Sequence, residues 1–261
     1  MEEYLDFAVS LALKAGEMIR TDFRKAIVRE WKADETPITT TDRKINQMVI
    51  EQVAKRYPTY AILAEEGSRP KESEYAWVCD PIDGTVPFSN KYPTSVFALA
   101  LTKNGESMLG VIYDPYMDRL LTAVKGQGAY CNKERIHVSE SDEFNKTTID
   151  VEAAREPFLH DISKLYELLL KKNSVAISLR SVSYGGMLVG IGQIAAVVGA
   201  PHSPWDGAAS KVIVEEALGK VTDLFGNNQR YDRELKGIII SNSCIHDAII
   251  KLVRPLLEKK V

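Results

Sequence analysis

Apolar residues recur at three- and four-residue steps near the start of the chain, which predicts an amphipathic helix. The apolar positions are Leu5, Ala8, Val9, Ala12, Ala15 and Ile19. A second helical pattern begins at Asp42 and ends before Pro58. The polar segment between the two patterns, residues 32–40, is expected to be a loop, so Asp42 is expected at a helix N-terminus.

Between Tyr60 and Thr122 the pattern changes to short apolar runs separated by Gly, Pro, Asn and Asp, which predict the strands of a sheet. The runs are YAILA, AWVC, SVFALAL, MLGVIY and RLLTA. The dipeptides Asn104-Gly105 and Asp114-Pro115 favour hairpins, so much of this sheet is expected to be antiparallel.

The second half of the chain alternates helical and strand patterns, which indicates layered α and β structure. The expected helices lie near Phe158–Lys171, at Asp206–Leu218 and near His246–Leu257; the expected strands are SVAIS and GIIIS, and an apolar stretch runs from Tyr184 to Val198. The polar segment at residues 139–148 is the expected seam between an N-terminal α+β half (1–148) and a C-terminal α/β half (149–261) of one compact unit.

Composition narrows the function classes. Of the 261 residues, 45% are apolar and 26% are charged, which is typical of a soluble globular domain and argues against global disorder. The formal net charge of −3, with both signs interspersed, gives no basic stripe, so nucleic acid is not an expected partner. Cys79, Cys131 and Cys244 are widely separated and form no CxxC pair, which suits reduced thiols and a cytoplasmic location.

The chain shows no pattern of membrane insertion. Its start, MEEYLDFAVSLALKAGEMIR, is acidic and carries Lys and Glu within the apolar pattern, unlike a signal peptide. The most apolar run, Met187–Ala200, is shorter than the roughly 18 to 20 residues that a membrane span needs. We therefore expect an intracellular protein without a membrane partner.

Acidic residues stand at the ends of several predicted elements, where side chains from distant segments can converge at one rim. They are Asp42, Glu65, Glu66, Asp80, Asp83 and Asp206. Carboxylate oxygens are ligands that Mg²⁺ prefers, whereas the four histidines show no ligand spacing. A magnesium site is our interpretation, although Asp42 and Asp206, taken singly, are also explained as helix caps.

The stretch WVCDPIDGT, residues 77–85, carries the strongest signal. Its two carboxylates lie three residues apart and repel each other unless a cation lies between them. Pro81 fixes a backbone angle and removes a donor, which favours a turn that aims both carboxylates and the Ile82 carbonyl at one point. Gly84 and Thr85 then offer backbone N–H groups to a phosphate oxygen.

The motif DPIDGT, with AEE upstream and WDGAASKVIVEEALGKVTD downstream, resembles the inositol monophosphatase family of Mg²⁺-dependent phosphatases. The resemblance covers nearly the whole chain and includes the segments TTTD, GVIYDPYMDRL and KGQGAY. It implies an α+β fold of layers stacked as an α-β-α-β-α sandwich, the sugar phosphatase fold, and it implies a homodimer.

The resemblance also implies a two-metal site. Glu65, Asp80 and the Ile82 carbonyl would bind one Mg²⁺ ion, and Asp80, Asp83 and Asp206 would bind a second. Asp80 would then bridge the two ions, which accounts for the close acid pair.

The remaining roles that the resemblance implies concern phosphate and water. Gly84 and Thr85 would hold the phosphate through their backbone N–H groups. The Thr85 hydroxyl, paired with Asp42, and Glu65 would position and deprotonate the attacking water, while Glu66 would support this arrangement from behind.

The activity that the resemblance implies is hydrolysis of a small phosphorylated alcohol, with inositol 1-phosphate the first expectation. Histidinol phosphate, fructose 1,6-bisphosphate and a phosphorylated nucleotide stay open as substrates, and a non-catalytic metal-dependent binding protein is the alternative from another class. Members that read inositol commonly carry a glutamate where this chain has Gly199, which predicts weak discrimination among polyols. His202 could face the leaving group, but a loop role is favoured.

Overall fold

The computed structural model describes residues 1–32, 37–153, 161–201 and 203–257. Its helices are α1 (Glu2–Phe23), α2 (Thr40–Arg56), α3 (Thr85–Ser89), α4 (Leu165–Lys171), α5 (Val182–Gly190), α6 (Ala208–Glu216) and α7 (His246–Leu257). A 3₁₀ turn, η1 (Pro204–Asp206), precedes α6. No helix within these ranges is both long and apolar enough to cross a membrane.

The strands form two large sheets and a two-stranded ribbon of β1 (Arg29–Trp31) and β2 (Pro37–Thr39). The first sheet consists, in spatial order, of β3 (Ala61–Ala64), β4 (Tyr75–Asp83), β5 (Val96–Lys103), β6 (Glu106–Asp114), β7 (Arg119–Val124), β8 (Ala129–Cys131) and β9 (Glu134–Arg135). The second consists of β11 (Val175–Ile177), β10 (Thr148–Glu152), β12 (Ala196–Gly199), β14 (Ile238–Ser241) and β13 (Lys220–Thr222).

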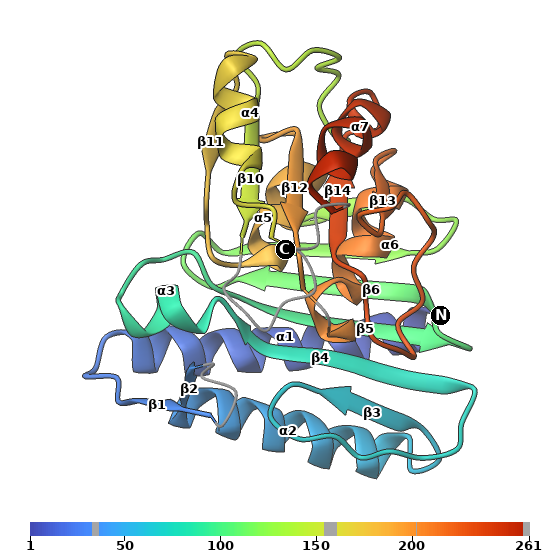
Figure 1. Cartoon of the computed structure of the whole chain (residues 1–261). Coiled ribbons are helices and arrows are strands. Elements are labelled where there is room, and N and C mark those ends of the chain that lie inside the picture. The colour runs from blue at the N-terminus through green and yellow to red at the C-terminus, as the bar shows by residue number, and fades with distance from the viewer. Residues whose placement is uncertain (33–36, 154–160, 202, 258–261) are drawn as a thin grey trace.

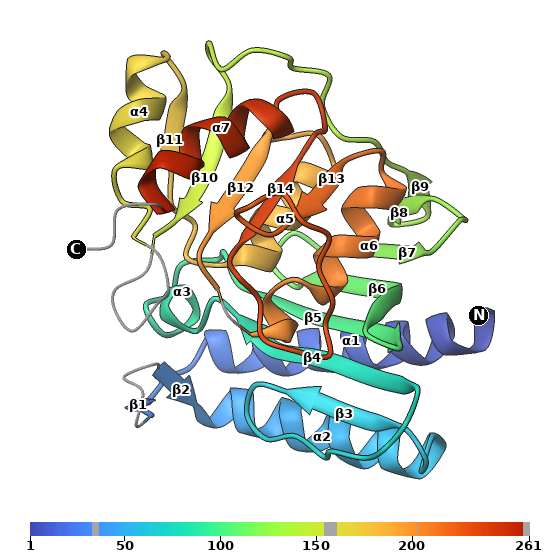
Figure 2. The ribbon, with the colours of Figure 1, turned by 45° about the vertical axis from the view of Figure 1, so that its right-hand side comes forward.

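Helices and sheets alternate as α-β-α-β-α layers (Figures 1 and 2). Helices α1 and α2 cover the outer face of the first sheet, α5 and α6 lie between the sheets, and α4 and α7 cover the outer face of the second. Because α6 packs against both β6 and β14, it joins the two sheets. The layered α+β fold predicted from the sequence is thus confirmed.

Each boundary between layers has an apolar core. Leu11 of α1 and Trp77 of β4 are buried between the first helical layer and the first sheet, and Met187 of α5 is buried between the two sheets. Ile149 of β10 and Ile249 of α7 are buried between the second sheet and the helices on its outer face. Strand β5 is covered on both faces, which explains why its sequence is a continuous apolar run rather than an alternating one.

Most predicted elements are present. The first helix and the last match their apolar stripes, and α2 begins at Thr40 with Thr39 as its N-cap, which puts Asp42 in the first turn. The hairpins expected at Asn104-Gly105 and Asp114-Pro115 join β5 to β6 and β6 to β7. Strand β3 is the exception to the expected antiparallel order, since it runs parallel to β4.

Three boundaries differ from the prediction. Residues 37–39 pair with β1 instead of forming a loop, because Ile38 buries its side chain there. Helix α6 begins at Ala208, since Asp206 belongs to the preceding 3₁₀ turn. The helix expected near Phe158 begins, within the described residues, at Leu165; residues 158–160 lie outside them.

Candidate active site

The candidate site lies where β3 and β4 end. The two strands are parallel and pair Ala64 with Cys79, so their carboxyl ends meet at the same edge. The backbone N–H of Glu65 donates to the Cys79 carbonyl at 3.3 Å. Glu65 therefore lies beside Asp80, the residue after Cys79, although ten residues of connecting chain separate the two strands in sequence.

The Asp80–Asp83 segment continues β4, so the predicted turn at Pro81 is wrong. The register against β5 shifts between Asp80 and Asp83, which marks a bulge. Pro81 lacks the N–H that a regular ladder would need, and the irregular stretch accommodates it. Both carboxylates are buried, and Asp80 Oδ1 accepts the Ile82 N–H at 3.0 Å. A bulge rather than a turn thus orients the acid pair.

Gly84 ends the acid segment in a conformation that favours glycine. It is the N-cap of α3 with φ of 95°, in the left-handed region. A Cβ at this position would lie 3.0 Å from the Thr94 carbonyl oxygen and 3.1 Å from the Ser181 Cβ. Thr85 is buried as the first residue of α3, so this part of the motif is the start of a helix.

Asp42 combines both roles considered for it. As the third residue of a capping box, its Oδ2 accepts the Thr39 N–H (2.9 Å) and the Thr39 hydroxyl, while its Oδ1 accepts the Thr85 hydroxyl at 3.2 Å. The Thr85 hydroxyl also lies 3.2 Å from the Ile82 carbonyl oxygen. Burial raises the pKa of Asp42 to about 6, against the hydrogen bonds from Thr39. The cap therefore fixes the carboxylate that faces Thr85.

Lys32 is a site residue that the sequence did not reveal. Its Nζ donates to Glu65 Oε1 at 2.8 Å and to Glu66 Oε1 at 2.9 Å. Burial works to lower the Lys32 pKa, but the two carboxylates outweigh it and raise the pKa above its ordinary value. A single lysine in a polar segment has no spacing that marks it; only the folded chain brings it to Glu65.

Asp206 reaches the site from η1, which packs against β3 and β4. Its Oδ2 accepts the Ser203 N–H at 3.3 Å in the capping box of η1, so it caps this 3₁₀ turn and not, as the sequence had suggested, the following helix α6. Burial raises the pKa of Asp206 well above its ordinary value, and the charges of Asp83 and Glu65 raise it further. The late aspartate thus shares one electrostatic environment with the acids of the first sheet.

Two serines between the sheets complete the surroundings of Asp83. The Ser183 N–H donates to Asp83 Oδ2 at 2.5 Å, and the Ser181 hydroxyl donates to the Asp83 carbonyl at 3.2 Å. Burial raises the pKa of Asp83 to about 6, and the bonds from Ser183 and Ser181 oppose that rise. The sequence did not reveal either serine, because a serine before a helical pattern is ordinarily explained as an N-cap.

The donor set suits a hard divalent cation. Burial raises the pKa of Asp80 well above its ordinary value, and the charges of Glu65, Asp83 and Asp206 add to this, so a cation among them would relieve both effects. All candidate ligands are oxygens, which Mg²⁺ prefers. In the described ranges no three His, Cys, Asp or Glu side chains converge closely enough to hold a metal. The carboxylates contact protein groups instead: Glu65 binds Lys32, and one oxygen each of Asp83 and Asp206 accepts a backbone N–H.

Two further predicted positions lie nearby in sequence. Gly199 is the last residue of β12 and is buried. His202, considered as a residue facing the leaving group, lies outside the described residues.

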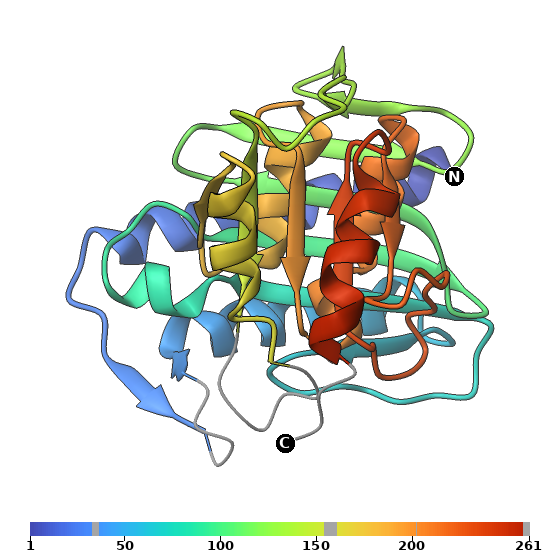
Figure 3. The same cartoon turned by 45° about the horizontal axis from the view of Figure 1, so that its top comes forward.

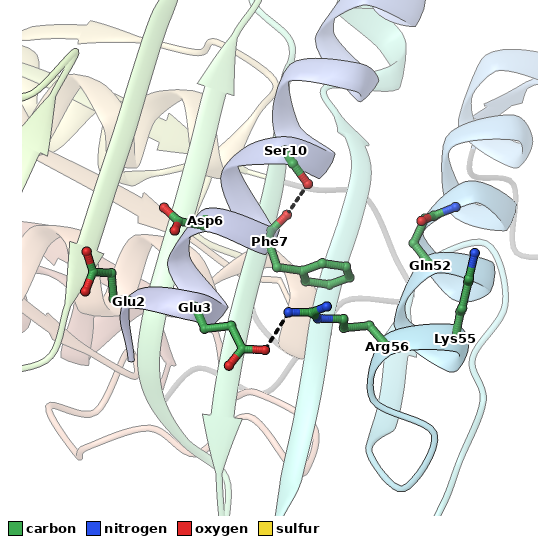
Figure 4. Close-up of a pocket in the computed structure, with 8 residues that line it drawn as sticks. All are labelled: Glu2, Glu3, Asp6, Phe7, Ser10, Gln52, Lys55 and Arg56. Carbon is green, nitrogen blue, oxygen red and sulfur yellow. Dashed lines mark hydrogen bonds and ion pairs between the residues drawn. The ribbon is translucent and has the colours of Figure 1, made fainter.

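A groove of about 740 Å³ lies at the other end of α2 and is separate from the site. Figure 4 shows its wall of acidic residues from the first turns of α1, crossed by the ion pair between Glu3 and Arg56. Lys55 lies thirteen residues along α2 from Asp42, or roughly 20 Å at the rise of an α-helix. The groove therefore takes no part in the chemistry of the acid pair.

Comparison with known proteins shows the family to which the chain is similar. Residues 1–258 match the model of the family described as the inositol monophosphatase family. A curated relative from Thermotoga maritima, named fructose-1,6-bisphosphatase/inositol-1-monophosphatase, is 33% identical over 256 residues, which cover 98% of this chain and 97% of that protein.

Solved structures show the same fold. The Thermotoga maritima IMPase superposes with a TM-score of 0.89 at 33% identity and covers 98% of each chain. An IMPase/NADP phosphatase complexed with Mg²⁺ and phosphate superposes with a TM-score of 0.82 at 25% identity, covering 96% of this chain and 95% of that one.

Proposed function

The chain belongs to the inositol monophosphatase family and is a phosphoric monoester hydrolase, and from that premise we propose a Mg²⁺-dependent enzyme that hydrolyses small phosphorylated alcohols, inositol 1-phosphate first among them. The observation that carries the mechanism is the hydrogen bond from the Thr85 hydroxyl to Asp42, at the end of a strand that terminates in two buried acids. This arrangement supplies a polarised hydroxyl beside a cluster of buried carboxylates.

The proposed metal ligands are Glu65, Asp80 and the Ile82 carbonyl for one ion, and Asp80, Asp83 and Asp206 for the second. Support comes from the oxygen-only donor set, from the burial and mutual repulsion of its carboxylates, and from the Mg²⁺ complex of a relative. Mg²⁺ supplies Lewis acid chemistry here: it shields the phosphate charge and makes water more acidic.

The protein residues handle phosphate and the proton. The backbone N–H groups of Gly84 and Thr85 open the first turn of α3, where N–H groups have no partner within the helix, and they are the proposed phosphate donors. Asp42 accepts a hydrogen bond from the Thr85 hydroxyl, so a lone pair of the Thr85 oxygen is free to accept a hydrogen bond from the attacking water. The proton that the water loses would pass to Thr85 as the Thr85 proton passes to Asp42. Glu65 is the second proposed base, held in place by Lys32, and Glu66 shares that lysine.

Fructose 1,6-bisphosphate is the second candidate substrate, because the 33% identical relative carries that activity in its name. Histidinol phosphate has no specific observation in its favour. The non-catalytic alternative is not supported, since the family and its relatives show a phosphatase.

We further propose a cytoplasmic homodimer with one compact structural unit per chain, divided at the seam into halves 1–148 and 149–261. The three cysteines are free, in keeping with a reducing compartment. Leu170 and Val175 are exposed where α4 meets the edge strand β11, and they offer an apolar surface to a second copy. Light scattering of the purified protein gives the mass that tests the homodimer.

Phosphate release tests the function. Inositol 1-phosphate, fructose 1,6-bisphosphate and p-nitrophenyl phosphate are incubated with the enzyme in Mg²⁺ and in EDTA. We expect release from at least one substrate in Mg²⁺ and none in EDTA. Turnover that is unchanged in EDTA would overturn the metal-dependent mechanism, and no turnover of any phosphomonoester would overturn the function.

A further inference from the structure

Strand β10 carries two acids where a buried strand is expected to carry apolar side chains. Ile149 and Val151 pack into the core beneath α4 and α7. The alternate positions, Asp150 and Glu152, face the other side of the sheet and are only 0% and 7% exposed. Moving a carboxylate from water into the protein interior costs free energy unless the carboxylate is paired or hydrogen-bonded there. The proposed phosphatase chemistry does not use either acid.

Asp150 is held but not fully satisfied. Its Oδ1 accepts the Leu179 N–H at 3.1 Å, whereas its Oδ2 is buried and has no hydrogen-bond partner among the described residues. The space beside Oδ2 exists because Gly185 has no side chain: a Cβ there would lie 2.5 Å from this oxygen. Burial first, and then the charge of Glu152, raise the pKa of Asp150 to about 9.

Glu152 lies at the carboxyl end of β10. Its Oε1 accepts the Arg180 N–H at 2.6 Å and lies 3.4 Å from the Ser178 hydroxyl. In the parallel register it lies opposite Gly199, and a Cβ on Gly199 would come within 3.2 Å of the Glu152 Cβ. The absence of a side chain at Gly199 therefore leaves this space to Glu152.

A short segment ties Glu152 to the candidate active site. Arg180 holds Glu152 through its N–H, and the following Ser181 and Ser183 hold Asp83 through the bonds already described. Figure 3 shows the second sheet, with α4 and α7 on its outer face, in front of the first sheet. The Glu152 charge also contributes to the raised pKa of Asp83. Glu152 thus borders the site on the side of the second sheet.

We propose that Glu152 determines specificity by accepting a hydrogen bond from a hydroxyl of the substrate alcohol. Asp150 positions Glu152 by binding the Leu179 N–H, next to the Arg180 N–H that holds Glu152. The inference rests on the proposed function and names its substrate class: phosphorylated polyols with a free hydroxyl close to the phosphate. It revises the weak discrimination expected from Gly199, because the acceptor comes from β10 instead of β12.

The test compares two classes of substrate in Glu152→Gln. The amide keeps the size of the side chain and an oxygen for the Arg180 N–H, but it removes the charge that strengthens a bond from a hydroxyl. We expect kcat/KM for inositol 1-phosphate and glycerol 2-phosphate to fall at least tenfold, and kcat/KM for p-nitrophenyl phosphate, which has no alcohol hydroxyl, to stay within about threefold. Glu143→Gln, an exposed change of the same charge, is the matched control and should alter neither.

Equal losses on both classes would show a structural role and overturn the proposal, as would full activity of Glu152→Gln on the polyol phosphates. Wild-type failure on every substrate would instead overturn the proposed function. Calorimetric titration with inositol 1-phosphate in Ca²⁺ then decides on Glu152 separately: the proposal requires weaker binding to Glu152→Gln than to the wild type.

Asp150→Asn separates positioning from charge. An amide oxygen can accept the Leu179 N–H as the carboxyl group does, so we expect the ratio of kcat/KM between polyol phosphate and p-nitrophenyl phosphate to remain within about threefold of wild type. Asp150→Leu, which removes the acceptor, should lower that ratio. A loss of the ratio in Asp150→Asn equal to that in Asp150→Leu would contradict the positioning role.

Discussion

The Thr85 hydroxyl donates to Asp42 Oδ1 across 43 residues of sequence, while the other oxygen of the same carboxylate caps α2. One aspartate therefore ties the start of α2 to the end of the acid strand. Because the cap fixes the rotamer of Asp42, the hydroxyl of Thr85 meets an acceptor whose position is set before substrate arrives. The relationship makes a hydroxyl at position 85 the most direct test of the mechanism.

Thr85→Ala should lower kcat by about a hundredfold to a thousandfold, because the group that accepts a proton from water is lost. The phosphate-binding N–H survives, so KM should change by less than about threefold. Steady-state kinetics on inositol 1-phosphate measures both. Thr85→Ser retains the hydroxyl and is the matched control. A large rise in KM with unchanged kcat would mean that Thr85 only binds substrate.

Asp83→Asn should cut kcat by on the order of a hundredfold at saturating Mg²⁺, because a proposed metal ligand loses its charge. The amide oxygen can still accept the Ser183 N–H, so the fold should persist, and a circular dichroism melt checks this. Asp142→Asn, at an exposed position, is the control for loss of one negative charge. Wild-type turnover in Asp83→Asn would remove Asp83 from the ligand set.

Lys32→Met should make the protein more dependent on Mg²⁺. Without the ammonium group, Glu65 and Glu66 repel each other in EDTA, and we expect about 1 to 2 kcal/mol of lost stability for this partly exposed triad. Mg²⁺ should restore much of it, so the rise in Tm on adding Mg²⁺ should be larger than in wild type. Lys55→Met is an exposed control. An identical Mg²⁺-induced shift in both variants would contradict the prediction.

Stability should depend on pH through His246, whose ring nitrogens lie 2.9 Å from the Thr222 hydroxyl and 2.7 Å from the Ser241 hydroxyl in the protein interior. Burial lowers its pKa from 6.5 to about 4. Between these values the unfolded state binds more protons than the native state, so stability is complete above pH 6.5 and is lost as the pH falls, at up to about 1.4 kcal/mol per unit.

Urea unfolding at pH 7.5 and pH 5 measures this loss. In His246→Gln the decrease between the two pH values should be smaller than in wild type, because the titrating group is gone. His137→Gln, at an exposed position, should retain the full decrease. If both variants lose stability equally with falling pH, His246 is not the group responsible.

Local signals in the sequence were enough for the parts of the fold that depend on neighbours along the chain. The apolar stripe of α1, the helix start near Asp42 and the turn at Asn104-Gly105 are all set within a few residues, and the structure confirms them, with the cap itself at Thr39. The acid pair was visible for the same reason. Its geometry was not, because the bulge at Pro81 depends on pairing with β5.

Residues whose roles depend on distant partners escaped prediction. Lys32 joins Glu65 only after the ribbon and β3 are in place. Asp150 and Glu152 occupy alternate positions of a short strand, and a strand with one polar face is ordinarily read as exposed on that face. Their burial follows from the second sheet packing on α5, which no local pattern shows.

The position of Asp206 has a consequence for folding kinetics. Glu65, Asp80 and Asp83 belong to the first sheet, whereas Asp206 meets them only when η1 packs against β3 and β4. A cation that joined Asp206 to β4 would act on the contact made when η1 docks on the first sheet. If docking follows the transition state, Mg²⁺ slows unfolding and leaves the folding rate nearly unchanged, so the metal lengthens the lifetime of the native state more than it hastens its formation.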